Sequence, residues 1–194
     1  MQQLDNYTKE KLTIDLTQAN LIGILILIPI VVLFGVPFYF IWTPTIDIKA
    51  FMEAVSPWTL GLGLIRLLAW LVFGIIAHEF IHGLTWAIFA TKGFKSIRFG
   101  VLWNMLTPYC HCKEPLTVRQ YITGAITPAI FLGFLPCLYA LFTGDTGVLI
   151  FGMFFTMAAC GDFMIIHLIR KENGSDLVQD HPSEAGCYIY RKTK

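Results

Sequence analysis

His78-Glu79-Phe80-Ile81-His82 lies within LVFGIIAHEFIHGLTWAIFA, an apolar stretch that covers residues 71–90. On a helix the two histidines fall one turn apart on the same face, so their imidazoles can bind one metal ion. Glu79 stands beside the first histidine, where a carboxylate can accept a proton from a metal-activated water. A carboxylate at the centre of a membrane helix costs about 2.5–3.5 kcal/mol and is rarely kept without a partner. The stretch therefore predicts a membrane helix that carries a metal site.

Composition indicates an integral membrane protein. The chain has 194 residues, of which 56% are hydrophobic and only 14% are charged, whereas a soluble domain would carry about a quarter charged residues. The net charge of +1 gives no reason to expect nucleic acid as a partner. The sequence has no internal repeat, which disfavours an inverted-repeat transporter.

Four apolar runs are long enough to cross about 30 Å of hydrocarbon. They cover residues 20–42, 58–90, 121–142 and 147–169. We therefore expect an all-α membrane protein with about four transmembrane helices and a short, partly extended cytoplasmic or interfacial segment between the second and third. The expected division is an N-terminal cytoplasmic tail (1–19), a single membrane-embedded domain (20–170) and a C-terminal cytoplasmic tail (171–194).

Lysine and arginine counts in the connecting segments predict the orientation. The loop after the first run holds only Lys49, whereas residues 91–120 and the C-terminal tail are each rich in basic residues. Positive residues concentrate on the cytoplasmic side of membrane proteins. We therefore expect a multi-pass protein of the cell membrane with both termini in the cytoplasm.

Asp162 is expected at the same membrane depth as the histidines. It precedes the end of the fourth run by about seven residues, and the histidines precede the end of the second run by roughly eight to twelve, at about 1.5 Å per residue. Glu79 and Asp162 are also the only acidic residues in the four runs. Two costly carboxylates at one depth, beside two histidines, predict a buried metal site.

Four motifs carry a resemblance to known proteins: His78–Gly83, Pro108-Tyr109, Thr127-Pro128 and Gly161-Asp162. The sequence resembles the small bacterial integral membrane proteins that are grouped as a domain of unknown function and described as zincin peptidases. It is also similar to intramembrane metalloproteases of the site-2 protease type. This resemblance implies His78 and His82 as zinc ligands, Asp162 as the third ligand and Glu79 as the general base. One departure is that Phe163 follows Asp162, where site-2 proteases usually have glycine.

The resemblance implies an intramembrane zinc metallo-endopeptidase in the lipid bilayer. Its substrate would be a membrane-embedded or juxtamembrane protein or peptide, hydrolysed by a metal-activated water. The alternative is a non-catalytic zinc-binding membrane scaffold or regulator, and a metal-ion carrier is a weaker third possibility. The first two functions differ over Glu79, because a structural site needs the ligands but not the base.

The segment between the second and third runs permits more than one interpretation. Residues 94–105 partly alternate in polarity, so they can form either a strand that pairs with substrate or an interfacial hairpin with no substrate role. Cys110-His111-Cys112 is spaced too tightly for a zinc knuckle. It predicts an ordinary cytoplasmic loop or, alternatively, a cover over the zinc site.

Other residues have mainly structural interpretations. Thr127-Pro128 predicts a helix kink or, alternatively, a substrate contact. We expect Gly74, Gly83 and Gly161 to let helices approach closely beside the proposed ligands. We expect His181 to be solvated in the polar tail.

Overall fold

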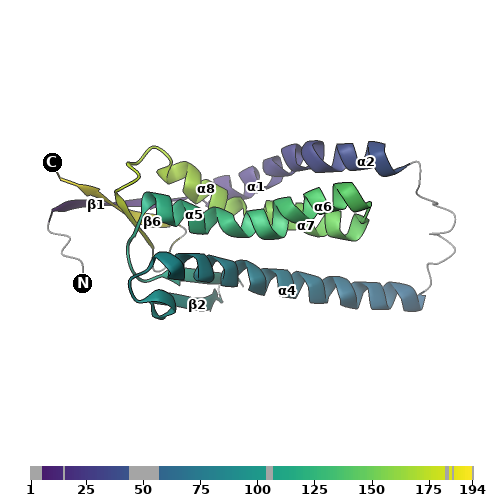
Figure 1. Cartoon of the computed structure of the whole chain (residues 1–194), viewed down its shortest axis with the longest axis horizontal. Helices are drawn as coiled ribbons and strands as arrows, with labels where there is room; N and C mark the ends of the chain where they lie inside the picture. The colour runs from purple at the N-terminus through teal and green to yellow at the C-terminus, as the bar shows by residue number, and fades with distance from the viewer. Residues whose placement is uncertain are drawn as a thin grey trace.

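The computed structural model describes residues 6–14, 16–43, 57–103, 107–181, 184 and 186–193. Lys49, on which the orientation argument partly rests, lies outside these ranges. The helices run along the long axis of the molecule, and the strands gather at one end together with both ends of the chain (Figure 1).

The chain forms groups of consecutive helices that are separated by short strands. The helices are α1 (Leu16–Ile30), α2 (Val36–Trp42), α4 (Pro57–Phe89), α5 (Val118–Pro128), α6 (Leu135–Thr143), α7 (Thr146–Ala158) and α8 (Cys160–Ile169). The strands are β1 (Tyr7–Thr13), β2 (Ile97–Leu102), β3 (Thr107–Cys112), β4 (Leu116–Thr117), β5 (Leu177–Asp180) and β6 (Gly186–Lys192).

Three helical segments of the described chain are long and apolar enough to cross a membrane: Leu21–Trp42, Leu60–Phe89 and Val118–Thr143. The pair α7 and α8 passes the same test only when both are taken together, and it is bent by 40° at the break between them. Many large apolar side chains on α1, α2 and α4 are exposed. Such surfaces are costly in water but not in lipid, which is consistent with a membrane protein.

The expectation of an all-α protein with four transmembrane helices is wrong. The described residues form two β-sheets, and three single helices, not four, meet the length and hydropathy of a span. The fourth apolar run is interrupted at Ala159, between α7 and α8. Hydropathy predicts how apolar a run is but contains no information on where its axis changes direction, so the break was not expected.

The larger sheet joins the two ends of the chain. Its strand order is β1-β6-β5-β4, and β1 pairs antiparallel with β6 from Tyr7↔Lys192 to Thr13↔Gly186. Arg191 on β6 forms ion pairs with Glu10 on β1 and with Glu172 beyond α8. Both segments were expected to be tails. His181, expected to be solvated there, is buried instead, and its Nδ1 accepts a hydrogen bond from the Glu184 backbone at 2.9 Å.

The smaller sheet is the hairpin of β2 and β3, which pair antiparallel with Phe99 opposite Cys110. An extended segment was expected at residues 94–105, and a strand is confirmed over Ile97–Leu102; Met105 lies outside the described residues. Cys110-His111-Cys112 belongs to β3, so the prediction of an ordinary loop there is wrong.

Two π-helical segments widen the helices between prolines. Val31–Gly35 follows Pro29 and precedes Pro37, and Ala129–Phe134 follows Pro128 and precedes Pro136. A proline ring clashes with the carbonyl four residues earlier and removes one hydrogen bond. A wider turn relieves that clash, and the helix continues across each proline pair.

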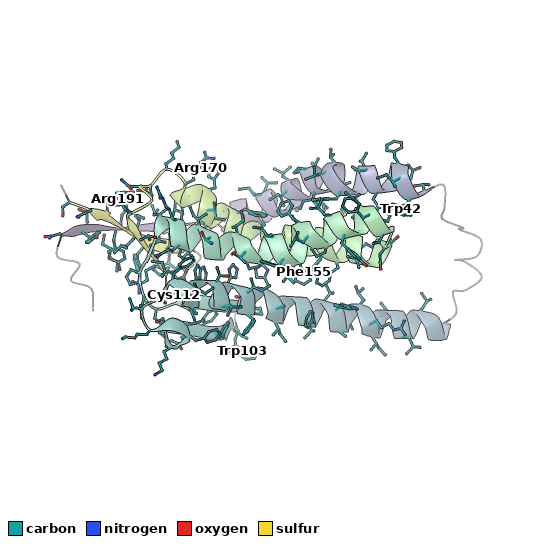
Figure 2. All side chains as sticks on the ribbon, in the orientation of Figure 1. Trp42, Trp103, Cys112, Phe155, Arg170 and Arg191 are labelled. Atoms are coloured by element: carbon teal, nitrogen blue, oxygen red, sulfur yellow. The ribbon has the colours of Figure 1, made fainter. Side chains whose placement is uncertain are left out.

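The buried apolar residues of the described chain form two core clusters. One lies among α1, α2, α6 and α7 and includes Phe34, Cys137 and Leu149. The other joins the C-terminal part of α4 to α5, the hairpin and the larger sheet, and it includes Trp86 and Tyr121. The second cluster lies at the end of the molecule where Cys112 is labelled, and Trp42 lies at the opposite end (Figure 2).

Glu114 ties the end of α4 to the hairpin, and this generates a pH-dependent prediction. Its carboxylate accepts hydrogen bonds from the Ser96 hydroxyl and from the backbone and hydroxyl of Thr91. The bond from Ser96 and those from Thr91 lower the pKa of Glu114 from 4.5 to about 2. A depressed carboxylate pKa stabilises the fold above the unfolded pKa and loses that effect as pH falls. We expect Glu114→Gln to lower the free energy of unfolding by about 1 kcal/mol at pH 7, since solvent partly screens these bonds.

Thermal unfolding of the detergent-solubilised protein between pH 7 and pH 3 checks this. The difference between wild type and Glu114→Gln should shrink steadily as the pH falls below about 4.5. A difference that stays constant over this range would contradict a charge-dependent role.

Candidate metal centre

His78 and His82 face the same point because they lie four residues apart on α4. Their Nε2 atoms lie 3.2 Å apart. His82 is buried, and His78 is 12% exposed in its side chain. The local helical geometry that the sequence predicts therefore produces a pair of nitrogen donors.

Asp162 reaches these histidines from the first turn of α8. Its Oδ2 lies 3.2 Å from Nε2 of His78, and its Oδ1 lies 3.2 Å from Nε2 of His82. The break at Ala159 starts a new helix just before Asp162, and a helix N-terminus favours a carboxylate. The structure thus brings together the three residues that the sequence analysis proposed as ligands.

The donor set fits a zinc ion. Tetrahedral zinc with bonds of about 2.0–2.1 Å places neighbouring donor atoms about 3.3 Å apart. The two Nε2 atoms lie 3.2 Å apart, and each lies 3.2 Å from a different oxygen of Asp162, Oδ2 for His78 and Oδ1 for His82, which is close to that distance. Two imidazoles and one carboxylate also match the ligand types of catalytic zinc sites, which leave a fourth position open. Among the described histidines, cysteines and acidic residues, these three have ligand atoms within 4.8 Å of one another, close enough to bind one ion.

A hydrogen bond orients His82 for this role. Its Nδ1 lies 2.9 Å from the carbonyl oxygen of Gly124 on α5. Because a carbonyl only accepts, Nδ1 carries a proton, so Nε2 is the nitrogen that would bind a metal ion. Such a second partner fixes the tautomer and the ring orientation of a metal-binding histidine.

Trp86 and Tyr121 support His82 from the other side, and sequence reasoning missed both. The Trp86 ring stacks on His82 with centroids 5.0 Å apart and planes inclined by 14°. Tyr121 stacks on Trp86 at 5.2 Å, and Nε1 of Trp86 donates to the Tyr121 carbonyl at 3.2 Å. His82 and Trp86 lie four residues apart on an apolar helix, so the sequence could have indicated their contact. No such spacing indicates the contact of Trp86 with Tyr121.

Glu79 lies beside the ligands and against the hairpin. The backbone of Cys110 on β3 donates a hydrogen bond to its carboxylate, and Glu79 interacts electrostatically with the three proposed ligands. Of the two interpretations of Cys110-His111-Cys112, the geometry favours a cover over the site. Burial raises the pKa of Cys112 to about 11, so this thiol is protonated at neutral pH.

The glycines beside the site differ in what they contact. A Cβ atom at Gly74 would overlap Phe155 of α7, which lies toward α4 (Figure 2), and one at Gly83 would meet Phe99 of the hairpin. A Cβ atom at Gly161 would meet nothing within 4 Å. The expectation of close helix contact therefore fits Gly74. At Gly83 the missing side chain lets the hairpin, not another helix, approach α4, and Gly161 faces open space.

Thr127 uses its hydroxyl locally, because Oγ1 donates to the Thr123 carbonyl within the same helix at 2.5 Å. Pro128 is followed directly by the π-helical segment Ala129–Phe134. These contacts support the structural interpretation of the Thr127-Pro128 pair.

Comparison with known proteins identifies a family for this region. Residues 71–176 match the family model described as "Putative zincin peptidase", and this stretch is more than half of the chain. It contains the two histidines, Glu79 and Asp162. No curated protein matches the chain, and neither does any solved structure.

Zinc content should depend on all three donors. We expect His82→Ala and Asp162→Ala to reduce bound zinc to below about a tenth of wild type, because two ligands do not hold the ion tightly. Mass spectrometry of the detergent-purified protein measures the stoichiometry. Asp145→Ala is the matched control, because this carboxylate caps the N-terminus of α7 through Val148. Full zinc content in Asp162→Ala would overturn its assignment as a ligand.

Two glycine variants test whether contact with Trp86 supports zinc binding, because an added methyl group is crowded at one position and has room at the other. A Cβ atom at Gly124 would overlap the Trp86 indole, whereas Gly161 has room. We expect Gly124→Ala to displace Trp86 and to weaken zinc binding, while Gly161→Ala keeps zinc and gains about 0.5–1 kcal/mol of helix stability. Zinc affinity and thermal unfolding of both variants test this. Equal zinc affinity in both would argue against support of the site by Trp86.

Proposed function

The chain belongs to the family described as "Putative zincin peptidase". On this premise we propose that it is an intramembrane zinc metallo-endopeptidase. The observation that carries the proposal is the convergence of His78, His82 and Asp162 at 3.2 Å with Glu79 beside them. The proposed ligands are the two histidines and Asp162, and the proposed general base is Glu79. This arrangement supports the resemblance to site-2 proteases.

A zinc ion held by these donors would supply Lewis acidity that activates a water molecule and polarises a peptide carbonyl. Glu79 then accepts the proton of the attacking water on its carboxylate. It returns that proton to the amine of the leaving peptide as the carbon–nitrogen bond breaks. The Cys110 backbone amide holds the carboxylate in place through this exchange, and the Gly124 carbonyl keeps the proton of His82 on Nδ1.

The position of the site favours a membrane-embedded or juxtamembrane substrate. All three donors lie on helices within apolar segments. A cavity of about 430 Å³ opens between α1 and the bent pair α7–α8, and Gly161, next to Asp162, is among its lining residues. This cavity provides mostly apolar space beside the helix that carries Asp162.

We also propose a multi-pass arrangement with both termini in the cytoplasm. The pairing of β1 with β6 keeps the two ends of the chain together (Figure 1). Arg170 and Arg191 lie at this end of the molecule (Figure 2), and basic residues concentrate on the cytoplasmic side. The site would then lie near the cytoplasmic surface of the bilayer.

Glu79→Gln should separate catalysis from metal binding. We expect cleavage to fall by about 10²–10⁴-fold, because an amide cannot accept the proton, while zinc content stays at the wild-type level. Fluorogenic single-span peptides in liposomes report cleavage, and mass spectrometry reports zinc. The control is Asp145→Asn, which changes a carboxylate that caps the N-terminus of α7. Stoichiometric zinc without wild-type cleavage of any peptide would instead favour a non-catalytic zinc scaffold.

A further inference from the structure

Asp180 connects the larger sheet to the metal centre by two hydrogen bonds. It is the last residue of β5 and lies beyond the family match, which ends at residue 176. Its Oδ1 accepts a hydrogen bond from the Tyr121 hydroxyl at 2.5 Å. Its Oδ2 accepts another from the Cys112 backbone amide at 3.0 Å. Each carboxylate oxygen thus holds a different element, α5 or β3.

The first bond leads to His82. Tyr121 contacts Trp86 twice, by ring stacking at 5.2 Å and by accepting the indole N–H at its carbonyl. Trp86 in turn stacks on His82 at 5.0 Å. The Tyr121 hydroxyl anchored on Asp180 therefore limits how far the Trp86 and His82 rings can move.

The second bond leads to Glu79. The amides of Cys110 and Cys112 lie two residues apart on β3, so they point to the same side of the strand. One donates to Glu79 and the other donates to Asp180. Asp180 therefore holds the strand edge that holds Glu79.

We propose that Asp180 is a positioning residue that aligns His82 through Tyr121 and Trp86, and Glu79 through β3. The part that concerns Glu79 rests on the proposed peptidase function, whereas the part that concerns His82 requires only metal binding. The Tyr121 hydroxyl and the Cys112 amide both donate, so the side chain at position 180 must offer two acceptor atoms. An asparagine has one acceptor oxygen and would oppose one of the donors with its own N–H groups.

Asp180→Asn and Tyr121→Phe test the proposal, with Tyr190→Phe as the matched control. Tyr121→Phe keeps the ring stack and removes only the hydroxyl. Tyr190→Phe removes a comparable hydrogen bond, from the Tyr190 hydroxyl to Gln179 at 3.1 Å in the same sheet. The measurements are zinc affinity by chelator competition, the visible absorption spectrum of the cobalt-loaded protein, and thermal unfolding of the metal-free protein.

We expect zinc affinity to fall about 10-fold or more in Asp180→Asn and by a smaller but measurable factor in Tyr121→Phe, which is the usual range for outer-shell changes. The cobalt spectrum should shift in both variants. Tyr190→Phe should lose similar thermal stability and keep wild-type affinity and spectrum. Wild-type affinity and spectrum in Tyr121→Phe would overturn the proposal, even if Asp180→Asn did not fold.

Cleavage at saturating zinc separates this proposal from the proposed function. A further loss of kcat in Asp180→Asn, beyond the loss explained by zinc, supports positioning of Glu79. Wild-type kcat in zinc-saturated Asp180→Asn would overturn that part. If wild type binds zinc but cleaves nothing, the peptidase function fails, and the metal affinities alone decide the alignment of His82.

Discussion

A carboxylate among apolar helices must be neutralised, and the arrangement around Asp162 follows from this constraint. An isolated charge at membrane depth is costly, so Asp162 needs partners from another element. The Nε2 atoms of His78 and His82 supply them at 3.2 Å. For this contact the axis of α8 must run in a different direction from the axis of α7. The break at Ala159 allows this change of direction. A zinc ion in this position would satisfy all three groups at once.

Elements both within and outside the long apolar helices converge on the same place. The Gly124 carbonyl and the Trp86 ring hold His82, and the hairpin holds Glu79 through Cys110. The sheet that joins the chain ends packs into the same core cluster as Trp86. The first half of α4, in contrast, exposes most of its apolar side chains. Dense protein packing thus surrounds the proposed metal ligands, while lipid would cover the remainder of the helices.

Secondary structure was predictable where one local signal dominates. Long apolar runs correctly predicted helices in the regions of α1, α4, α5 and α7, and partial alternation correctly predicted an extended segment at β2. The larger sheet was missed because β1 is seven mostly exposed residues and its partner β6 lies at the other end of the chain. Short strands are stable only through such pairing and burial. Neither segment contains that information by itself.

The candidate site likewise has features that local sequence predicts and features that depend on contacts between separate elements. The sequence by itself determined that His78 and His82 share a helix face with Glu79 between them, because helix periodicity brings residues four apart together wherever a helix forms. It also identified Asp162 as the other acidic residue of the apolar runs. Only the tertiary structure decided that Asp162 meets the histidines, that Gly124 orients His82, and that Asp180 reaches Tyr121. Contacts between separate elements depend on how the whole chain packs, and no local spacing specifies them.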